Sequence, residues 1–418
     1  MDTNLTYSKF RWFWLWTVTF SFTVVGIFII APSTIVGEMA QQLGVSVAAI
    51  SAASMGTFSF VSAIGCIASG PILDKFGVPK VITVGAILTF LPTLLFPVFG
   101  GTITGVMALR IIMGLGTGPV VACVSIVALK WFPPNERPIY SGFQGTGISL
   151  GVMIGLFAVP QLMNVTGGNW KAVFVWLGIA PFIALVSCII TIFAKEPPKP
   201  VRPDNSHDFA KAVRRPEFYF TILVIFIGIW IMDAFNDLTP GYMAIPAPMG
   251  LGFGGAVAGM SMMFVSIGSI IGALLSGFIV LKAFNGRVKP CIVLGFIGCA
   301  IFTLSVRFPF IYNNSAVLYT CLFFQGFSVS LVIPQTAMYV AQAFPHSVVG
   351  KVYGTAMGIG VFGSVGITVG AYILHATGSY HGPIYVVAAI SAIGAIIGLY
   401  LNIPKEKQVA AQEARVNA

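Results

Sequence analysis

The sequence predicts an all-α integral membrane protein with twelve transmembrane helices, and its composition is the first observation behind that prediction. Hydrophobic residues fill 57% of the 418 positions, whereas charged residues fill only 8%. Soluble domains carry about a quarter charged residues. Because so few charges cannot cover a surface that faces water, most of the surface must face lipid. A hydrocarbon core of about 30 Å needs about 20 apolar residues per helix, and about twelve such runs fit this chain.

The second observation is the placement of the 22 Lys and Arg residues along those runs. All but three fall on the side of the membrane that holds the N-terminus. Lys171 and Arg307 fall on the other side, and Arg110 lies within a run. This asymmetry follows the positive-inside rule and predicts that both termini are cytoplasmic. The orientation of the chain in the membrane therefore explains the net charge of +10, and no nucleic-acid partner is expected.

The apolar runs give the expected helices in order. The first covers about 10–38, with an interruption at Pro32 near its outer end, and is interpreted as a retained helix rather than a signal peptide. The next three cover about 47–73, 78–100 and 103–131, and the fifth and sixth end near 163 and 193. Six more cover about 216–245, 252–284, 288–310, 315–345, 348–374 and 382–404, and kinks are expected at Pro160 and Pro334.

A polar segment divides the chain nearly in half. Residues 195–215 are rich in Pro and basic residues and are predicted to form a cytoplasmic linker. The predicted bundles are 1–194 and 216–404, and 405–418 is a polar cytoplasmic tail. At an offset of 212 residues the halves match at Gly114 and Gly326, Phe132-Pro133 and Phe344-Pro345, Gly142 and Gly354, and Gly151 and Gly363. The repeat predicts two pseudo-symmetric six-helix bundles.

The stretch from Gly70 to Gly77, with Asp74 and Lys75 inside it, lies between two membrane-length runs. It resembles the loop signature of the major facilitator superfamily of transporters, and the resemblance extends over essentially the whole chain. It implies two bundles that rock around a central site, with the residues at Asp74 and Lys75 helping to latch the cytoplasmic side. A degraded second copy begins at Gly277, where Leu281 stands in the Asp position.

Arg110 is the leading candidate for substrate binding. Its surroundings resemble the Arg motif of the family's fourth helix, although Met113 replaces the usual Gln. It lies about 10 Å from the outer end of its helix. A guanidinium there costs several kcal/mol unless it meets water, a partner or a ligand, and its fork fits a carboxylate. Three interpretations stay open: it binds an anionic substrate, couples protons through an acidic neighbour, or ties the fourth helix to the first.

Three carboxylates are candidates for ion coupling. Asp233 and Asp237 are four residues apart and so share one helix face. Asp233 lies about 24 Å along the helix from Glu217, and Pro240 is predicted to break the helix after the pair. Such a pair suits a proton or cation site, and the alternative is a solvated pair at the outer mouth. Glu38 is the third candidate, and its alternative is a solvated helix end.

Other polar and small residues complete the expected site. Four polar residues in apolar runs are candidates to line a substrate cavity: Gln144, Asn236, Gln325 and Gln335. Closely spaced Gly residues in the fifth and eleventh helices predict close helix packing, with sliding during transport as a further hypothesis: Gly147, Gly151, Gly155, Gly354, Gly358, Gly366 and Gly370. No phosphate-binding Gly-rich loop and no nucleophile–base pattern occurs, so no ATP drive, cofactor, metal or enzyme activity is expected.

The sequence therefore predicts a secondary transporter of a small, carboxylate-like organic anion. It would work by alternating access, coupled to protons or exchanging anions, as a monomer in a bacterial inner membrane. The alternative within transport is efflux of amphipathic or hydrophobic compounds, which a chain with 35 Phe residues favours. The alternative of another class is a membrane sensor that does not transport.

Overall fold

The computed structural model describes residues 8–45, 49–50, 52–194, 208–244, 246–345 and 347–402. Within these ranges twelve helical spans are long and apolar enough to cross a membrane, and no strand occurs. The prediction of an all-α membrane protein with twelve spans is thereby confirmed.

The chain packs as two compact units. Unit 1 consists of Met1–Pro134, Phe143–Ser206 and Gly350–Gly358, and unit 2 of Asn135–Gly142, His207–Val349 and Ile359–Ala418. Each unit thus holds one short segment from the other predicted bundle. The boundaries at 194 and 216 stay a prediction. Residues 195–207 of the linker and the tail 405–418 lie outside the described residues.

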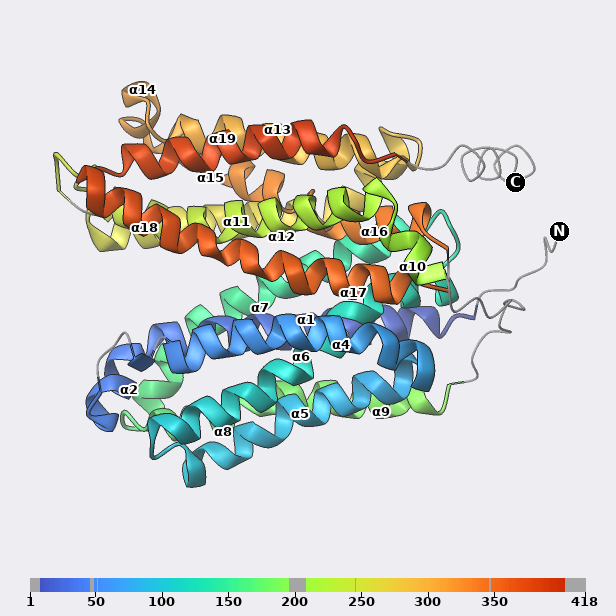
Figure 1. Ribbon diagram of the computed structural model, residues 1–418. Coiled ribbons are helices and arrows are strands. Elements are labelled where there is room, and N and C mark those ends of the chain that lie inside the picture. Colours follow the sequence, from blue (N-terminus) through green and yellow to red (C-terminus); the bar gives the residue numbers. More distant parts are fainter. Residues whose placement is uncertain are drawn as a thin grey trace. The chain divides into compact units, whose positions relative to one another are not determined.

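Unit 1 is built from the first six spans, several of which are interrupted (Figure 1). Its elements are α1 (Arg11–Ile30), η1 (Ala31–Thr34), α2 (Val36–Leu43), a π-helical turn η2 (Ala52–Gly56), α4 (Thr57–Phe76), α5 (Val78–Phe99), α6 (Ile103–Trp131), most of α7 (Arg137–Val165), α8 (Trp170–Leu177) and α9 (Ile179–Ile192), together with most of α17 (Val349–Gly360). The predicted interruption at Pro32 is confirmed, because α1 ends at Ile30 and Pro32 lies in η1.

Helix α6 is the most enclosed of the spans. In its most apolar window 83% of the residues are buried, against 22% for α7. It packs against both α4 and α5. A charged side chain on the inner part of α6 is therefore removed from both lipid and water.

Close packing of α7 on α1 depends on the glycines that the sequence singled out. A Cβ atom on Gly147 would lie 2.5 Å from the carbonyl oxygen of Thr19, which is closer than non-bonded atoms approach. A Cβ atom on Gly151 would overlap the carbonyl oxygen of Thr23. The predicted close approach is thereby confirmed for α7. The hypothesis that these helices slide stays untested.

Unit 2 holds the remaining spans except for the part of α17 that belongs to unit 1 (Figure 1). Its elements are α10 (Asp208–Val213), α11 (Pro216–Ala244), α12 (Gly254–Lys282), α13 (Val288–Ser305), α14 (Pro309–Tyr312), α15 (Ser315–Val329), α16 (Ile333–Ala343), η3 (Val361–Ser364), α18 (Val365–Thr377) and α19 (His381–Gly398), together with the start of α7 up to Gly142.

Two prolines of unit 2 behave differently. The expected irregularity near Pro334 is confirmed, because α15 ends at Val329 and α16 begins just before Pro334, where no backbone N–H is needed. The predicted break at Pro240 is wrong, because α11 continues through it to Ala244. A proline frees one carbonyl, whereas a chain that left the helix within lipid would expose several unpaired backbone groups.

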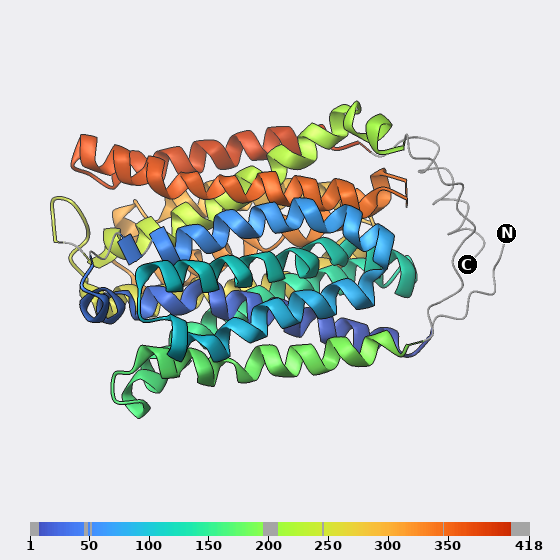
Figure 2. The same ribbon diagram turned by 60° about the horizontal axis from the view of Figure 1, so that its bottom comes forward.

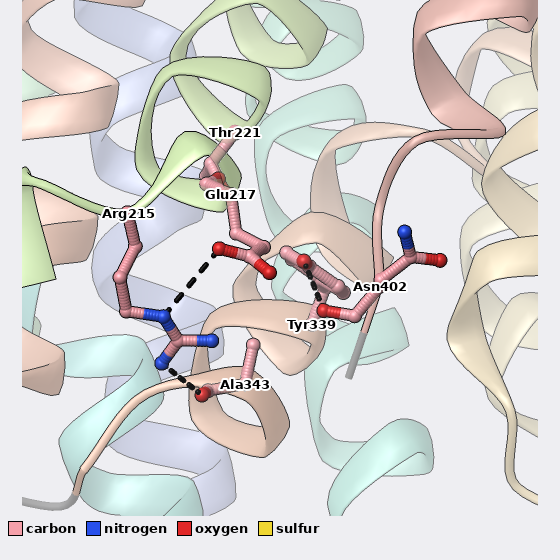
Figure 3. A network of polar contacts seen from close by, with 6 residues as sticks. All are labelled: Arg215, Glu217, Thr221, Tyr339, Ala343 and Asn402. Carbon is pink, nitrogen blue, oxygen red and sulfur yellow. Dashed lines mark hydrogen bonds and ion pairs between the residues drawn. The ribbon is translucent and has the colours of Figure 1, made fainter. Parts of the chain in front are cut away.

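A polar network fixes one end of unit 2 (Figure 3). The Nε atom of Arg215 lies 3.4 Å from the carboxylate of Glu217, and its Nη1 donates to the carbonyl of Ala343 at 3.2 Å. The hydroxyl of Tyr339 donates to the carbonyl of Asn402 at 2.9 Å. The start of α11, the end of α16 and the chain after α19 are thereby held together, which fixes α16 in the unit.

Candidate functional site

Arg110 lies in the interior of unit 1 and is fully buried. Among the described residues it is the only Lys or Arg more than three positions inside a span. Its Nε donates to the carbonyl oxygen of Ser54 at 2.8 Å, and its Nη2 donates to that of Phe28 at 2.8 Å. The guanidinium carbon lies 4.2 Å from the ring centroid of Phe58. The positive charge is thus held by two carbonyl dipoles and an aromatic face.

Pro32 explains why a carbonyl is available for Arg110 on α1. In a regular helix the carbonyl of Phe28 would accept a hydrogen bond from the backbone N–H of residue 32. Proline has no N–H, so this carbonyl is left without a helical donor in a buried place. The Nη2 of Arg110 takes the donor's role. The second carbonyl, of Ser54, belongs to the π-helical turn η2, where the regular hydrogen-bond pattern is also disturbed.

One nitrogen of Arg110 remains open. Its Nη1 is buried and has no hydrogen-bond partner among the residues that the structure describes. No ion pair joins Arg110 to a carboxylate within the described part of the chain. The observed contacts are those of a tie between α6, α1 and the second span, and Nη1 is the atom that remains able to donate to a ligand.

Gln144 also belongs to unit 1, on α7. It is buried, and its Nε2 lies 3.4 Å from the hydroxyl oxygen of Thr19 on α1. Glu38 is exposed in the first turn of the short helix α2. Within unit 1, then, Arg110 and Gln144 are both interior residues next to α1, whereas Glu38 is not an interior residue.

The carboxylate pair lies on α11 in unit 2. Asp233 is half-buried, and its Oδ2 accepts a hydrogen bond of 2.5 Å from the hydroxyl of Ser364 in η3. Asp237 and Asn236, one turn further along, are exposed. The two carboxylates therefore occupy different environments, and in the described part of the chain only Asp233 has a side-chain donor.

Two glutamines of unit 2 are fully buried. The Nε2 of Gln335 on α16 donates to the hydroxyl of Ser276 at 2.9 Å, so this amide serves packing between α16 and α12. Within the described ranges, Gln325 on α15 has no hydrogen-bond partner for either its amide nitrogen or its amide oxygen. A buried amide with both ends unpaired is costly, which marks Gln325 as a side chain that gains from contact with a polar ligand.

The loop signature places its small residues at close contacts and turns. A Cβ atom on Gly70 would lie 2.8 Å from the Cα of Lys351 at the start of α17, within unit 1. Gly77 ends α4 with φ of +85°, a conformation that favours glycine. Lys75 is exposed beside the ring of Phe76, and the side chain of Asp74 lies outside the described part of the structure.

Sequence reasoning missed three groups around the candidate residues: the carbonyl of Ser54, the ring of Phe58 and the hydroxyl of Ser364. The carbonyl of Phe28 had a signal, because Pro32 always frees the carbonyl four residues before it when the chain is helical. The other groups are brought to their partners only by the packing of separate spans, and no pattern in the sequence marks them.

Comparison with known proteins gives the family. The family model described as Major Facilitator Superfamily matches residues 16–287 and 242–417. The chain is 26% identical to a protein of Cupriavidus necator named "Probable sulfoacetate transporter SauU", over 82% of this chain and 83% of that one. It is 25% identical to the "Probable galactarate/D-glucarate transporter GudP" of Bacillus subtilis, over 84% and 83% of the two chains.

A solved structure gives the same answer for the fold. The proton:xylose symporter XylE superposes with a TM-score of 0.73, covering 94% of this chain and 96% of that one at 15% identity. With twelve apolar spans, a family model that matches nearly the whole length and this structural likeness, the chain is a multi-pass membrane transporter that belongs to the major facilitator superfamily.

Proposed function

We propose that the protein carries a small organic anion across the inner membrane of a bacterium by alternating access. The observation that carries this proposal is the guanidinium of Arg110. It is fully buried in the most enclosed span, and its nitrogen Nη1 has no partner among the described residues. An N–H of a guanidinium pairs best with a carboxylate or another oxyanion. The names of the relatives agree, because sulfoacetate and D-glucarate are both anions that carry carboxylates.

Gln325 is proposed as the second substrate-binding group. Its unpaired amide offers a donor and an acceptor, which suits the hydroxyl or carboxylate oxygens of such a substrate. Gln144, Gln335 and Asn236 remain weaker candidates, because the first two already donate hydrogen bonds within their units and the third is exposed.

Protons are the proposed coupling ion, and Asp233 is the proposed carrier. Its carboxylate is half-buried far inside a span and is held by Ser364, so it has the access and the fixed position that a proton carrier needs. Asp237 and Glu38 are exposed and are proposed to be solvated. The bundles 1–194 and 216–404 are proposed to rock against each other, so that the site opens in turn to the inside and the outside. Both termini are proposed to be cytoplasmic and the protein to be a monomer.

The test uses purified protein in liposomes and measures uptake of labelled sulfoacetate and D-glucarate, with xylose as the neutral control. The informative variant is Gln325→Leu. Because Gln325 has no partner to lose, this change should leave the thermal midpoint unchanged or higher, yet raise the KM for the anion about tenfold, the worth of a hydrogen bond to a charged group. Uptake of xylose but of neither anion would contradict the proposal. Thermal stabilisation of the protein only by amphipathic cations would also contradict it and would favour efflux.

A further inference from the structure

A pocket opens on unit 1 between the end of α7 and the start of α8, and neither Arg110 nor Gln144 lines it. It has a volume of about 630 Å³, which is within the range of small-ligand pockets. Its walls include Gln42 of α2, Pro97 of α5, the Gly167-Gly168 turn, and Lys171 and Trp176 of α8. The transport mechanism proposed above uses none of these residues.

The turn and its cap shape the polar side of this pocket. Gly167 and Gly168 have φ values of +63° and +82°, which let the chain reverse sharply after α7. The side chain of Asn169 accepts from the backbone N–H groups of Lys171 and Ala172 and so starts α8. Gln42 donates to the carbonyl of Gly168 at 3.0 Å and holds α2 against the turn.

Lys171 makes the pocket positive. It is half-buried, and its ammonium lies beside Gly101 and 5.9 Å from the ring centroid of Trp170. No carboxylate lines the pocket, and none forms an ion pair with Lys171 in the part of the chain that the structure describes. The first turn of a helix adds positive potential of the same sign. The ligand that fits this charge is an anion.

The apolar side of the pocket continues into surfaces that face lipid. Pro97 belongs to an exposed stripe on α5 with Leu94 and Val98. Trp176 begins a similar stripe along α8 and α9 with Ile179 and Phe182, whose exposed fractions are 54%, 54% and 51%. Helix α5 runs alongside the span that α8 and α9 form end to end (Figure 2). The pocket therefore lies at the end of two apolar stripes, the level at which Trp residues meet lipid headgroups.

We propose that this pocket binds the headgroup of an anionic phospholipid. The phosphate pairs with the ammonium of Lys171, the glycerol part contacts Gln42 and the Gly167-Gly168 turn, and an acyl chain lies along Trp176. A soluble anion shares the charge of the phosphate but gains nothing from Pro97 and Trp176, which is why a lipid fits both sides of the pocket and a free anion fits only one.

The test places the purified protein in nanodiscs of phosphatidylcholine with phosphatidylglycerol and counts retained phosphatidylglycerol by native mass spectrometry. Lys171→Gln should retain about tenfold less at the tightest site, because one charge-assisted contact is lost. Lys171→Arg should retain the wild-type amount, and Trp176→Ala should fall between the two. Lys80→Gln, which removes an exposed cation at the opposite end of α5, is the matched control and should retain the wild-type amount.

A second arm separates the sources of the anion. Inorganic phosphate and D-glucarate are titrated into protein in phosphatidylcholine alone, and thermal stability is compared for wild type and Lys171→Gln. The proposal expects no difference between them. A stabilisation by a soluble anion that depends on Lys171, or equal retention of phosphatidylglycerol by wild type and Lys171→Gln, would overturn it. Neither measurement involves transport, so the outcome is independent of the proposed substrate.

Discussion

At the scale of single residues, the buried cation Arg110 and Pro32 of η1 act on the same backbone carbonyl. Pro32 removes a donor and leaves the carbonyl of Phe28 unpaired, and Arg110 supplies the missing donor from another helix. A buried guanidinium and an unpaired backbone carbonyl are each costly inside a membrane, and the hydrogen bond between them lowers both costs. In the part of the chain that the structure describes, Nη1 of the same side chain has no partner, so structural and binding roles do not exclude each other.

This pairing predicts a measurable coupling. Arg110→Met removes the side-chain donor from the carbonyls of Phe28 and Ser54, and at about 1–3 kcal/mol for each lost bond the free energy of unfolding should fall by about 2–6 kcal/mol. Pro32→Ala restores a backbone N–H that reaches Phe28 without Arg110. The double variant should therefore lose about 0.5–3 kcal/mol less than the sum of the single changes, as measured by denaturation in detergent. If the stability losses of the two single variants simply add, the hydrogen bond from Arg110 to Phe28 does not depend on Pro32.

Asp233 gives a second prediction at this scale, which rests on the proposed function. In Asp233→Asn the amide oxygen still accepts from Ser364, so the fold should be kept, but the side chain no longer binds a proton. Uptake should lose its stimulation by an inward proton gradient, while exchange of labelled for unlabelled anion continues. Asp237→Asn, which alters the exposed carboxylate one turn away, is the control and should keep the stimulation. If Asp233→Asn uptake still follows the gradient, another group couples protons.

At the scale of elements, glycine spacing and proline placement decide how the spans meet and where they are interrupted. Gly147 and Gly151 of α7 lie against backbone atoms of α1, and Gly354 and Gly358 of α17 lie in the same way against α4 within unit 1. In lipid, where apolar surfaces gain little by leaving the solvent, such close packing is a main source of helix association.

Gly147→Ala tests that packing. Its Cβ would lie 2.5 Å from the carbonyl of Thr19 and 2.9 Å from the Cβ of Phe22, so α7 and α1 must move apart and stability should fall by about 1–3 kcal/mol. Gly101→Ala is the matched control, because a Cβ there meets only the ammonium of Lys171, at 3.7 Å. Thermal midpoints of both variants in the same detergent give the comparison. Equal midpoints would mean that α7 packs on α1 more loosely than described.

At the scale of the whole molecule, each unit contains a short segment from the other half of the sequence. Unit 1 contains Gly350–Gly358, and unit 2 contains Asn135–Gly142. Within unit 1 the glycine of the loop signature, Gly70, meets the backbone of Gly350 and Lys351; within unit 2 its degraded counterpart, Gly277, meets Pro138 and Ile139. The two copies of the signature therefore use their glycines in the same way, although the second lacks the acidic residue.

Gly70→Ala should slow the exchange of access without abolishing ligand binding. The new Cβ would lie 2.8 Å from the Cα of Lys351 and 2.9 Å from the carbonyl of Gly350, so the state with this contact formed is destabilised. The ligand's dissociation constant, measured by thermal stabilisation, should change less than the turnover rate in liposomes. Asp74→Asn is expected to behave in the same direction, as the family resemblance implies. An equal loss of binding and turnover in both variants would contradict a gating role for this loop.

Much of the fold was predictable because membrane burial imposes a strong one-dimensional signal. Residues in lipid must be apolar and helical over about 20 positions, so the twelve spans, the break at Pro32 and the close contacts of Gly147 and Gly151 follow from composition and spacing. The predicted break at Pro240 was wrong. Proline ends helices readily where water can pair with the freed backbone groups, and less readily in lipid, where it cannot.

The sequence alone determined the class of protein and a short set of side chains that are costly to bury, among them Arg110, Asp233 and Gln325. Only the tertiary structure decided what each of them contacts. Arg110 meets carbonyls from two other spans, Asp233 meets Ser364 from a segment 131 residues away, and Gln325 meets no partner among the residues described. The physical reason is that the cost of burial belongs to a residue and its position along a span, whereas its compensation comes from atoms that distant helices bring within about 3 Å.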